Sequence, residues 1–288
     1  MTPFTLNIKG RTLRAQKPLV MGIINLTPDS FYDKSRKRDT PAIQQSINKM
    51  VADGADILDF GACSTRPEAT PCSVREEMDR LRPALDIFRR MNTGKPASID
   101  TFRADVARMA VEEYGVDIIN DISAGELDPE MFPTAARLRV PYILTHNAAK
   151  RGNGTAEVSE SEFLAGVLRF FQDKIVALQL SGVADIILDP GFGFGKTVWQ
   201  NHLLLHNLQL LGNTFHKPVL AGVSRKSMIT TVLNISAHAA LNATTVLHTI
   251  VLLNGAYILR VHDVKEAVEA VKLCHLSGFQ QLETSGSL

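Results

Sequence analysis

The chain has 288 residues, of which 45% are hydrophobic and 21% are charged, as is ordinary for a globular protein with a sizeable core. Its 31 Lys and Arg residues nearly balance 30 Asp and Glu residues, giving a formal net charge of +1. This balance argues against nucleic acid or an anionic membrane as a partner recognised by bulk charge. It leaves room for a local cationic pocket.

Cysteine usage and apolar runs bear on location. Cys63, Cys72 and Cys274 are few, odd in number and without metal-type or CxxC spacing, which suggests a reducing compartment. The N-terminal residues contain no apolar segment of signal-peptide type, and the longest apolar run, residues 246–253, is too short to span a bilayer. We therefore expect a cytoplasmic protein without a membrane partner.

The chain opens with a strand-like alternation over residues 4–15 that turns at Lys9-Gly10, which predicts a β-hairpin within residues 1–17. Short apolar runs follow, separated by segments of helical periodicity. One helical segment begins at Ser73, where Glu76 three residues on completes a capping box. The apolar runs are residues 19–26, 55–61, 96–100, 116–121, 141–146, 184–190, 218–224 and 256–262.

This alternation predicts the fold. Continuous apolar strands, each followed by a helix, indicate a parallel sheet covered on its outer face. Eight such units favour an α/β fold of the (β/α)₈ TIM-barrel type, and a doubly wound open sheet is the alternative. No linker or low-complexity segment interrupts the pattern. We expect one domain over residues 1–288, with the barrel over 18–276 and a flexible tail over 277–288.

Polar side chains end the predicted strands, at the barrel face where active sites of this fold lie. A lone carboxylate there can merely cap the next helix, but Lys and Arg are disfavoured at helix N-termini. Cationic groups suit a phosphate, whereas carboxylates and amides suit a heterocycle rich in N–H donors. The sequence therefore predicts a heterocyclic substrate bearing a phosphate ester. The strand-end residues are Asn25, Asp59, Asp100, Asn120, Asp121, His146, Asp189, Ser224, Arg225, Lys226, Arg260 and His262.

The segment DPGFGFGKT, residues 189–197, resembles two nucleotide-binding motifs and satisfies neither. A P-loop would need Gly at Pro190, and the dinucleotide fingerprint would need its third Gly at Lys196. We therefore expect neither nucleotide binding nor ATP hydrolysis from this segment.

Seven motifs, in order along residues 21–271, resemble the dihydropteroate synthase family of pterin-binding enzymes. They are MGIINLTPDSF (21–31), STRP (64–67), SIDTFRADVA (98–107), INDISAG (119–125), DPGFGFGKT (189–197), GVSRKSM (222–228) and RVHDV (260–264). The resemblance implies a barrel enzyme of folate biosynthesis, usually a homodimer, that uses Mg²⁺. Its reaction joins 6-hydroxymethyl-7,8-dihydropterin diphosphate to p-aminobenzoate, giving 7,8-dihydropteroate and pyrophosphate by dissociative C–O cleavage.

The resemblance also implies residue roles. The pterin ligands would be Asp100, Asn120, Asp189 and Lys226. The pyrophosphate ligands would be Asn25, Thr65, Arg66, Arg260 and His262, with Asn25 also at the Mg²⁺ position. The p-aminobenzoate side would comprise Phe31, Thr65, Pro67, Phe194 and Ser227, with Asp33 on the same loop as Phe31. The catalytic residues would be Asp100, Lys226, Arg260 and His262.

The chain departs from the family pattern at Glu68, where a Gly is usual, and at Thr145, where a Met is common. Two alternatives therefore stay open: a pterin-binding methyltransferase and a non-catalytic pterin-binding paralogue. A methyltransferase would need no pyrophosphate site, so Arg66, Arg260 and His262 together favour the synthase.

Overall fold

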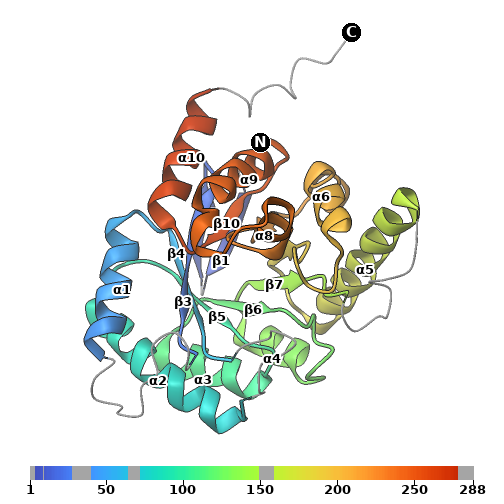
Figure 1. Ribbon diagram of the computed structural model, residues 1–288. Coiled ribbons are helices and arrows are strands. Elements are labelled where there is room, and N and C mark those ends of the chain that lie inside the picture. The colour runs from blue at the N-terminus through green and yellow to red at the C-terminus, as the bar shows by residue number, and fades with distance from the viewer. Residues whose placement is uncertain (1–3, 9, 28–39, 64–71, 149–158, 278–288) are drawn as a thin grey trace.

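A computed structural model describes residues 4–8, 10–27, 40–63, 72–148 and 159–277 of the chain. Its centre is an eight-stranded parallel sheet in the order β8-β7-β6-β5-β4-β3-β10-β9 (Figure 1). A parallel bridge between Leu188 and Val219 joins the two ends of that order. Because β8 and β9 meet, the sheet is a barrel, as predicted, and the doubly wound alternative is wrong. The strands are β3 (Leu19–Asn25), β4 (Ile57–Gly61), β5 (Ala97–Asp100), β6 (Ile118–Asp121), β7 (Tyr142–Thr145), β8 (Ile186–Asp189), β9 (Leu220–Ala221) and β10 (Ile258–Val261).

Helices surround this barrel (Figure 1). Their buried side chains pack with the outward-facing strand residues, such as Leu58, Ile99 and Leu188, into the main apolar core. The helices are α1 (Thr40–Ala52), α2 (Val74–Met91), α3 (Ala104–Tyr114), α4 (Met131–Leu138), α5 (Glu160–Ser181), α6 (Val198–His206), α7 (Gln209–Phe215), α8 (Ser227–Leu233), η1 (His238–Ala240), α9 (Leu241–Leu253) and α10 (Val264–Leu276).

The predicted capping box at the start of α2 is confirmed. The Ser73 hydroxyl accepts the Glu76 N–H, and the Glu76 carboxylate accepts the Ser73 N–H at 2.8 Å. Both bonds satisfy amides that have no partner inside the helix. Ser159 and Thr197 cap α5 and α6 in the same way.

The predicted N-terminal hairpin is also confirmed. Strands β1 (Phe4–Ile8) and β2 (Arg11–Ala15) pair antiparallel, with Leu6 opposite Leu13. Leu6 and Ile8 are buried in a cluster with residues from the barrel strands, among them Met21. The hairpin thereby covers the end of the barrel opposite to the carboxyl ends of its strands. Of the predicted tail, residues 278–288 lie outside the described part of the chain.

One pairing was not predicted from cysteine spacing. Cys63, which follows β4, and Cys72, which precedes α2, form a disulfide, while Cys274 is a buried free cysteine. The sequence separation of 9 residues matches no cysteine motif, and only the fold brings the two side chains together.

Among the described helices, none is by itself long and apolar enough to cross a membrane. The segments Ser227–Leu233 and His238–Leu253 pass that test only as a pair, and they meet at a bend of 98°.

Candidate active site

The carboxyl ends of four neighbouring strands bring polar residues to one level. In the strand register Asn25 pairs with Gly61, Gly61 with Asp100, and Asp100 with Asn120. A cavity of about 510 Å³ opens at this end of the barrel. Its lining includes Asn25, Thr27, Cys63, Asp100, Phe192, Phe194, Ser224, Lys226, Ser227, Arg260 and His262.

Arg260 is the centre of a charged network. Its Nε donates to Asp59 Oδ2 at 2.6 Å, and its Nη2 donates to Asp100 Oδ2 at 2.5 Å. The Asp59 Oδ2 atom also accepts from Asn120 Nδ2 at 3.1 Å. The Arg260 guanidinium thus bonds the carboxylates of Asp59 and Asp100, which lie on the adjacent strands β4 and β5. Asp59 in turn bonds the side-chain amide of Asn120 on the next strand, β6.

Burial sets the protonation of this network. Desolvation raises the pKa of Asp100 to about 7; the Arg260 charge opposes this shift, while the Asp59 charge adds to it. Desolvation lowers the pKa of Arg260, but Asp59 and Asp100 outweigh it and raise the pKa above its ordinary value. Arg260 therefore stays a cation, whereas Asp100 can change its charge near neutral pH.

Two buried acceptors in the network have no protein partner among the described residues. They are Asp59 Oδ1 and Asn120 Oδ1, on side chains that are 0% and 2% exposed. A buried acceptor left unpaired costs roughly 1–3 kcal/mol, so such atoms point to donors that a ligand supplies. A flat heterocycle with N–H groups on one edge meets this requirement.

The DPG turn positions Asp189 at the end of β8. Its Oδ1 accepts the Gly191 N–H at 2.7 Å, and its pKa is raised by desolvation, against the opposing charge of Lys226. Gly191 has φ +67°, and a Cβ there would lie 2.1 Å from the His146 carbonyl oxygen. Only glycine fits this turn.

Lys196 forms hydrogen bonds with the backbone of the same turn. Its Nζ donates to the carbonyl oxygens of His146 at 2.9 Å and Gly191 at 2.8 Å. Desolvation lowers its pKa to about 7. The Lys196 amino group is thus bonded to backbone carbonyls of its own loop and of His146, which agrees with the prediction that the segment is not a P-loop.

Lys226, which follows β9, is a cation that lines the cavity beside the same loop. Its Nζ donates to the Phe192 carbonyl oxygen and lies 4.9 Å from the centre of the Phe194 ring. Desolvation lowers its pKa to about 8, against the opposing effect of Asp189. The group is therefore mostly protonated at neutral pH and has further N–H donors for a ligand.

His262 lies at the cavity wall beside Ser224, whose hydroxyl oxygen is 3.0 Å from His262 Nδ1. Desolvation and the Arg260 charge lower the pKa of His262 to about 4. The imidazole is therefore neutral near pH 7 and can serve an anion as a hydrogen-bond donor, but not as a cation. Arg225 is tied elsewhere, in a bidentate ion pair with Asp263 at 2.8 and 2.9 Å.

The structure brings most of the predicted site residues together at one end of the barrel. Five predicted residues lie outside the described part of the chain: Phe31, Asp33, Thr65, Arg66 and Pro67. The residues found at this end are Asn25, Asp100, Asn120, Asp189, Phe194, Lys226, Ser227, Arg260 and His262.

Asp59 is among the strand-end residues of the sequence, but the residue roles implied by the family resemblance do not include it. Its carboxylate is fully buried and contacts both Arg260 and Asn120. The available signal was its place near the end of a predicted strand, the same place that identified Asp100 and Asp189. His146, which was left out of the predicted site, is buried and packs edge-on against Phe170, with ring centres 4.8 Å apart.

Comparisons with known proteins agree with this geometry. Residues 21–262 match the family model described as pterin binding enzyme. The dihydropteroate synthase of Escherichia coli K12 is 37% identical over 268 residues, covering 92% of this chain and 93% of that protein. The chain spans 57% of a folate synthesis bifunctional protein from Arabidopsis thaliana, at 35% identity.

Solved structures give the same result. A Xanthomonas albilineans dihydropteroate synthase with 4-aminobenzoic acid superposes with a TM-score of 0.87 at 35% identity, covering 96% of this chain and 98% of that one. A Coxiella burnetii dihydropteroate synthase in complex with pteroic acid also gives 0.87 at 35% identity, covering 95% and 98%. This chain therefore belongs to the dihydropteroate synthase family, the pterin-binding transferases of folate biosynthesis.

Proposed function

We propose that the chain condenses 6-hydroxymethyl-7,8-dihydropterin diphosphate with p-aminobenzoate, releasing 7,8-dihydropteroate and pyrophosphate. The proposal is carried by two buried acceptors, Asp59 Oδ1 and Asn120 Oδ1, which find no partner in the described part of the chain and lie at the same barrel end as the cations Arg260 and Lys226. Acceptors suit the donor edge of a pterin, and cations suit a diphosphate. The Xanthomonas albilineans enzyme was solved with 4-aminobenzoic acid and the Coxiella burnetii enzyme with pteroic acid.

The pterin would take its hydrogen bonds from three walls. Asn120 Oδ1 and the Asp189 carboxylate would accept from the N–H and amino groups of the ring. Lys226 would donate to ring acceptors from the side of β9, while Asp100 would face the ring nitrogen at the far edge. Because these groups are held by Asp59, Gly191 and the Phe192 carbonyl, the site is preorganised for the ring.

The diphosphate would lie over Arg260, His262 and Asn25. Arg260 commits its Nε and Nη2 atoms to carboxylates, so Nη1 is the guanidinium nitrogen assigned to the leaving group. His262 would donate from its neutral ring. Thr65 and Arg66 would add to this site by family resemblance.

The donor chemistry at Asn25 fits Mg²⁺. Its side chain lies at the cavity, where Oδ1 accepts the Thr27 N–H at 3.1 Å, and an amide oxygen is a hard ligand of the kind that Mg²⁺ prefers. Mg²⁺ usually binds through few protein oxygens together with substrate phosphates. Asn25 would thus hold the ion with the diphosphate, where it supplies charge neutralisation. We expect chelation of divalent cations to reduce pyrophosphate release, and Mg²⁺ to restore it.

The chain's own residues would support a dissociative reaction. As the C–O bond to the diphosphate breaks, Arg260 and His262 stabilise the leaving anion and the ionised Asp100 stabilises the cation spread over the pterin. The amine of p-aminobenzoate then bonds to the exocyclic carbon and releases a proton. Phe194 and Ser227 would contact this second substrate, with Phe31, Thr65 and Pro67 assigned to it by resemblance.

We also propose a cytoplasmic homodimer. The dimer is supported by a group of exposed apolar side chains on the packed helices α9 and α10, among them Val246, Leu253 and Leu273, 51%, 44% and 66% exposed. Light scattering on the eluting protein should give twice the chain mass of 31.6 kDa. A monomer at micromolar concentration would contradict the dimer.

The deciding experiment measures pyrophosphate release with each substrate alone and with both together. We expect release to require dihydropterin diphosphate and product to require p-aminobenzoate as well. Tight pterin binding without turnover would favour the non-catalytic paralogue, and methyl transfer from a methylated pterin would favour the methyltransferase. A sulfonamide, with which a Yersinia pestis dihydropteroate synthase was solved in complex, should compete with p-aminobenzoate.

A further inference from the structure

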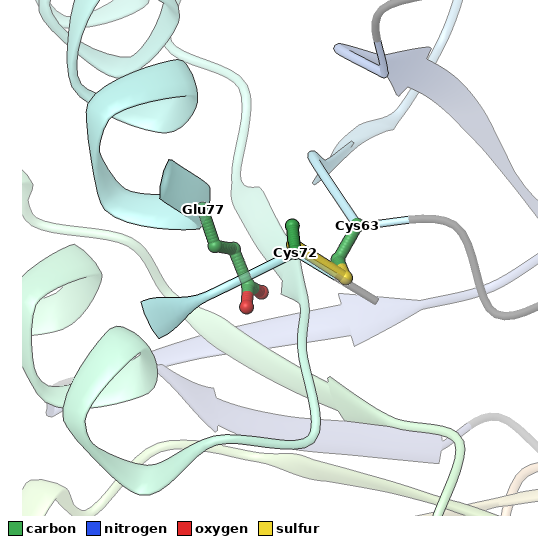
Figure 2. A group of neighbouring side chains, drawn as sticks. All are labelled: Cys63, Cys72 and Glu77. Carbon is green, nitrogen blue, oxygen red and sulfur yellow. A yellow bond between two sulfur atoms is a disulfide. The ribbon is translucent and has the colours of Figure 1, made fainter. Parts of the chain in front are cut away.

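We propose that Cys63 and Cys72 are a site of reversible thiol–disulfide exchange whose oxidation state controls binding of p-aminobenzoate. Figure 2 shows the two sulfur atoms bonded, with the Glu77 side chain beside them. The Cα atoms are 5.9 Å apart, a separation at which disulfides form without backbone movement. The functional part of this inference rests on the synthase activity proposed above.

The position of the pair links it to the active site. Cys63 lines the catalytic cavity together with Asp100, and Cys72 lies where the chain enters α2.

The disulfide changes the wall of the cavity itself. In the oxidised state Cys63 is bonded to Cys72, so the end of β4 is tied to the start of α2. Reduction leaves a free thiol on Cys63, which lines the same cavity as Phe194 and Ser227, the described residues assigned to p-aminobenzoate. The two redox states should therefore differ in their affinity for that substrate.

The chemistry around the sulfurs suits exchange. Arg103, the residue before α3, donates from Nη2 to the Cys72 carbonyl oxygen at 2.5 Å. Its Nη1 lies 3.9 Å from Cys63 Sγ and 3.7 Å from Cys72 Sγ, and it pairs with Glu77. A guanidinium at this distance stabilises a thiolate, the form that attacks disulfides.

The Glu77 charge opposes the effect of Arg103, so that neither the disulfide nor the dithiol is favoured by both charges. Its carboxylate is fully buried, and its oxygen lies within 4.8 Å of both sulfur atoms. A buried carboxylate disfavours two thiolates beside it and thus favours the neutral disulfide, while Arg103 favours the thiolate. Because Arg103 and Glu77 act in opposite directions, the cysteine pair is suited to change between the reduced and the oxidised state.

Two thiols and a carboxylate could in principle hold a metal cation, but Arg103 argues against this. Its guanidinium already bonds Glu77 and contacts both sulfurs, so a cation would have to displace another cation. Zinc binding is therefore an outcome of the test that would overturn the inference.

The exchange needs only a small-molecule disulfide as oxidant, such as oxidised glutathione. The thiolate of one cysteine attacks that disulfide, forms a mixed disulfide and expels one small-molecule thiolate. The second cysteine then attacks the sulfur of the first and expels the other. Two protein thiols thus become one disulfide as the oxidant takes up two electrons and two protons to become two thiols.

The test equilibrates the full chain with mixtures of reduced and oxidised glutathione. Free thiols are trapped by alkylation and mapped by mass spectrometry, and steady-state kinetics is measured on the same samples. We expect Cys63 and Cys72 to titrate together. We also expect KM for p-aminobenzoate to differ roughly fivefold or more between the fully oxidised and reduced states.

Cysteine variants test whether the redox response comes from Cys63 and Cys72. Cys63→Ser and Cys72→Ser should each abolish the redox response, whereas Cys274→Ser, which removes the free cysteine, should retain it. A pair that stays oxidised or reduced in every mixture, equal KM in both states, or zinc bound by reduced protein in place of oxidation would each overturn the inference. Thiol mapping requires no turnover, so failure of the synthase proposal would show separately, as absent pyrophosphate release in both states.

Discussion

The two ends of the barrel are built from the same strands but differ in nearly every physical property. At the hairpin end, β1, β2 and the strand beginnings bury an apolar cluster that includes Leu6, Ile118 and Ile258. At the opposite end, Asp59, Asn120 and Asp189 are buried, Asp59 and Asn120 bond to each other, Asp59 bonds Arg260, and Asp189 accepts the Gly191 N–H. One end is closed by apolar packing, and the other carries acceptors that have no protein partner among the described residues.

This contrast explains how the fold can hold an energetically costly site. Buried acceptors that have no protein partner among the described residues reduce stability, while the apolar cluster under the hairpin contributes to it without taking part in chemistry. Substitutions at the two ends should therefore separate: those at the hairpin end should change stability, and those at the cavity end should change binding.

The largest expected effect is on stability at the hairpin end. Ile118→Ala removes a fully buried side chain from the apolar cluster, and large-to-small core changes of this kind cost about 2–5 kcal/mol. Urea unfolding should show this loss, while kcat of the folded fraction stays near the original value. Leu276→Ala, at a side chain that is 82% exposed, is the matched control and should leave unfolding unchanged.

The next effect is on binding at the cavity end of β8. Asp189→Asn keeps the shape but replaces an acceptor by a donor facing the donor edge of the ring, at a cost of about 1–3 kcal/mol. Calorimetry should show pterin affinity reduced roughly 5- to 150-fold. Asp185→Asn, next to the opposite end of the same strand, should leave pterin affinity unchanged; an equal loss there would break the distinction between the ends.

Gly191→Ala should affect both properties. The left-handed φ costs an alanine about 1–2 kcal/mol, and its Cβ would collide with the His146 carbonyl, so the turn that orients Asp189 must shift. Both the unfolding midpoint and pterin affinity should fall. Gly94→Ala is the control for the cost of the left-handed backbone, because Gly94 has φ +70° and an added Cβ would meet no atom within 4 Å. This variant should lower stability without changing pterin affinity.

The smallest effect is a dependence on pH. Because the pKa of Asp100 is raised to about 7, the ionised form that stabilises the pterin cation is lost as pH falls through that value. We expect kcat/KM to fall by up to tenfold per pH unit on this acidic limb. Asp100→Asn should remove the limb together with most of the activity.

The stability of the folded state should respond to Asp100 in the opposite direction. The folded chain binds this proton more tightly than the unfolded chain, so ionisation lowers the free energy of unfolding as pH rises from about 4 to about 7. Comparison with Asp100→Asn by urea unfolding across this window isolates the contribution. A carboxyl whose pKa were lowered by Arg260 would give the reverse slope.

Local sequence signals predicted the elements well for a physical reason. The apolar runs, the hairpin turn at Gly10 and the Ser73–Glu76 capping box are determined by residues within a few positions of one another. The strand-end positions of Asp100 and Asp189 follow from the same local pattern, since parallel strands end on one side of a barrel.

Partner choice across the fold could not be predicted in this way. Arg260 pairs with Asp59 over a separation of 201 residues, and Arg103 reaches Cys72 over 31. Burial, which lowers the pKa of His262 and makes it a neutral donor, likewise depends on the assembled cavity. The disulfide between Cys63 and Cys72 belongs to the same class of features.

The most direct test of the account is a crystal structure of the chain with pteroic acid bound. We predict that the pterin ring lies at the carboxyl end of the barrel, with donors within hydrogen-bond distance of Asn120 Oδ1 and the Asp189 carboxylate, and with Lys226 Nζ on a ring acceptor. A ring bound elsewhere, or bound in the cavity with Asn120 Oδ1 and Asp189 left without ligand donors, would contradict it.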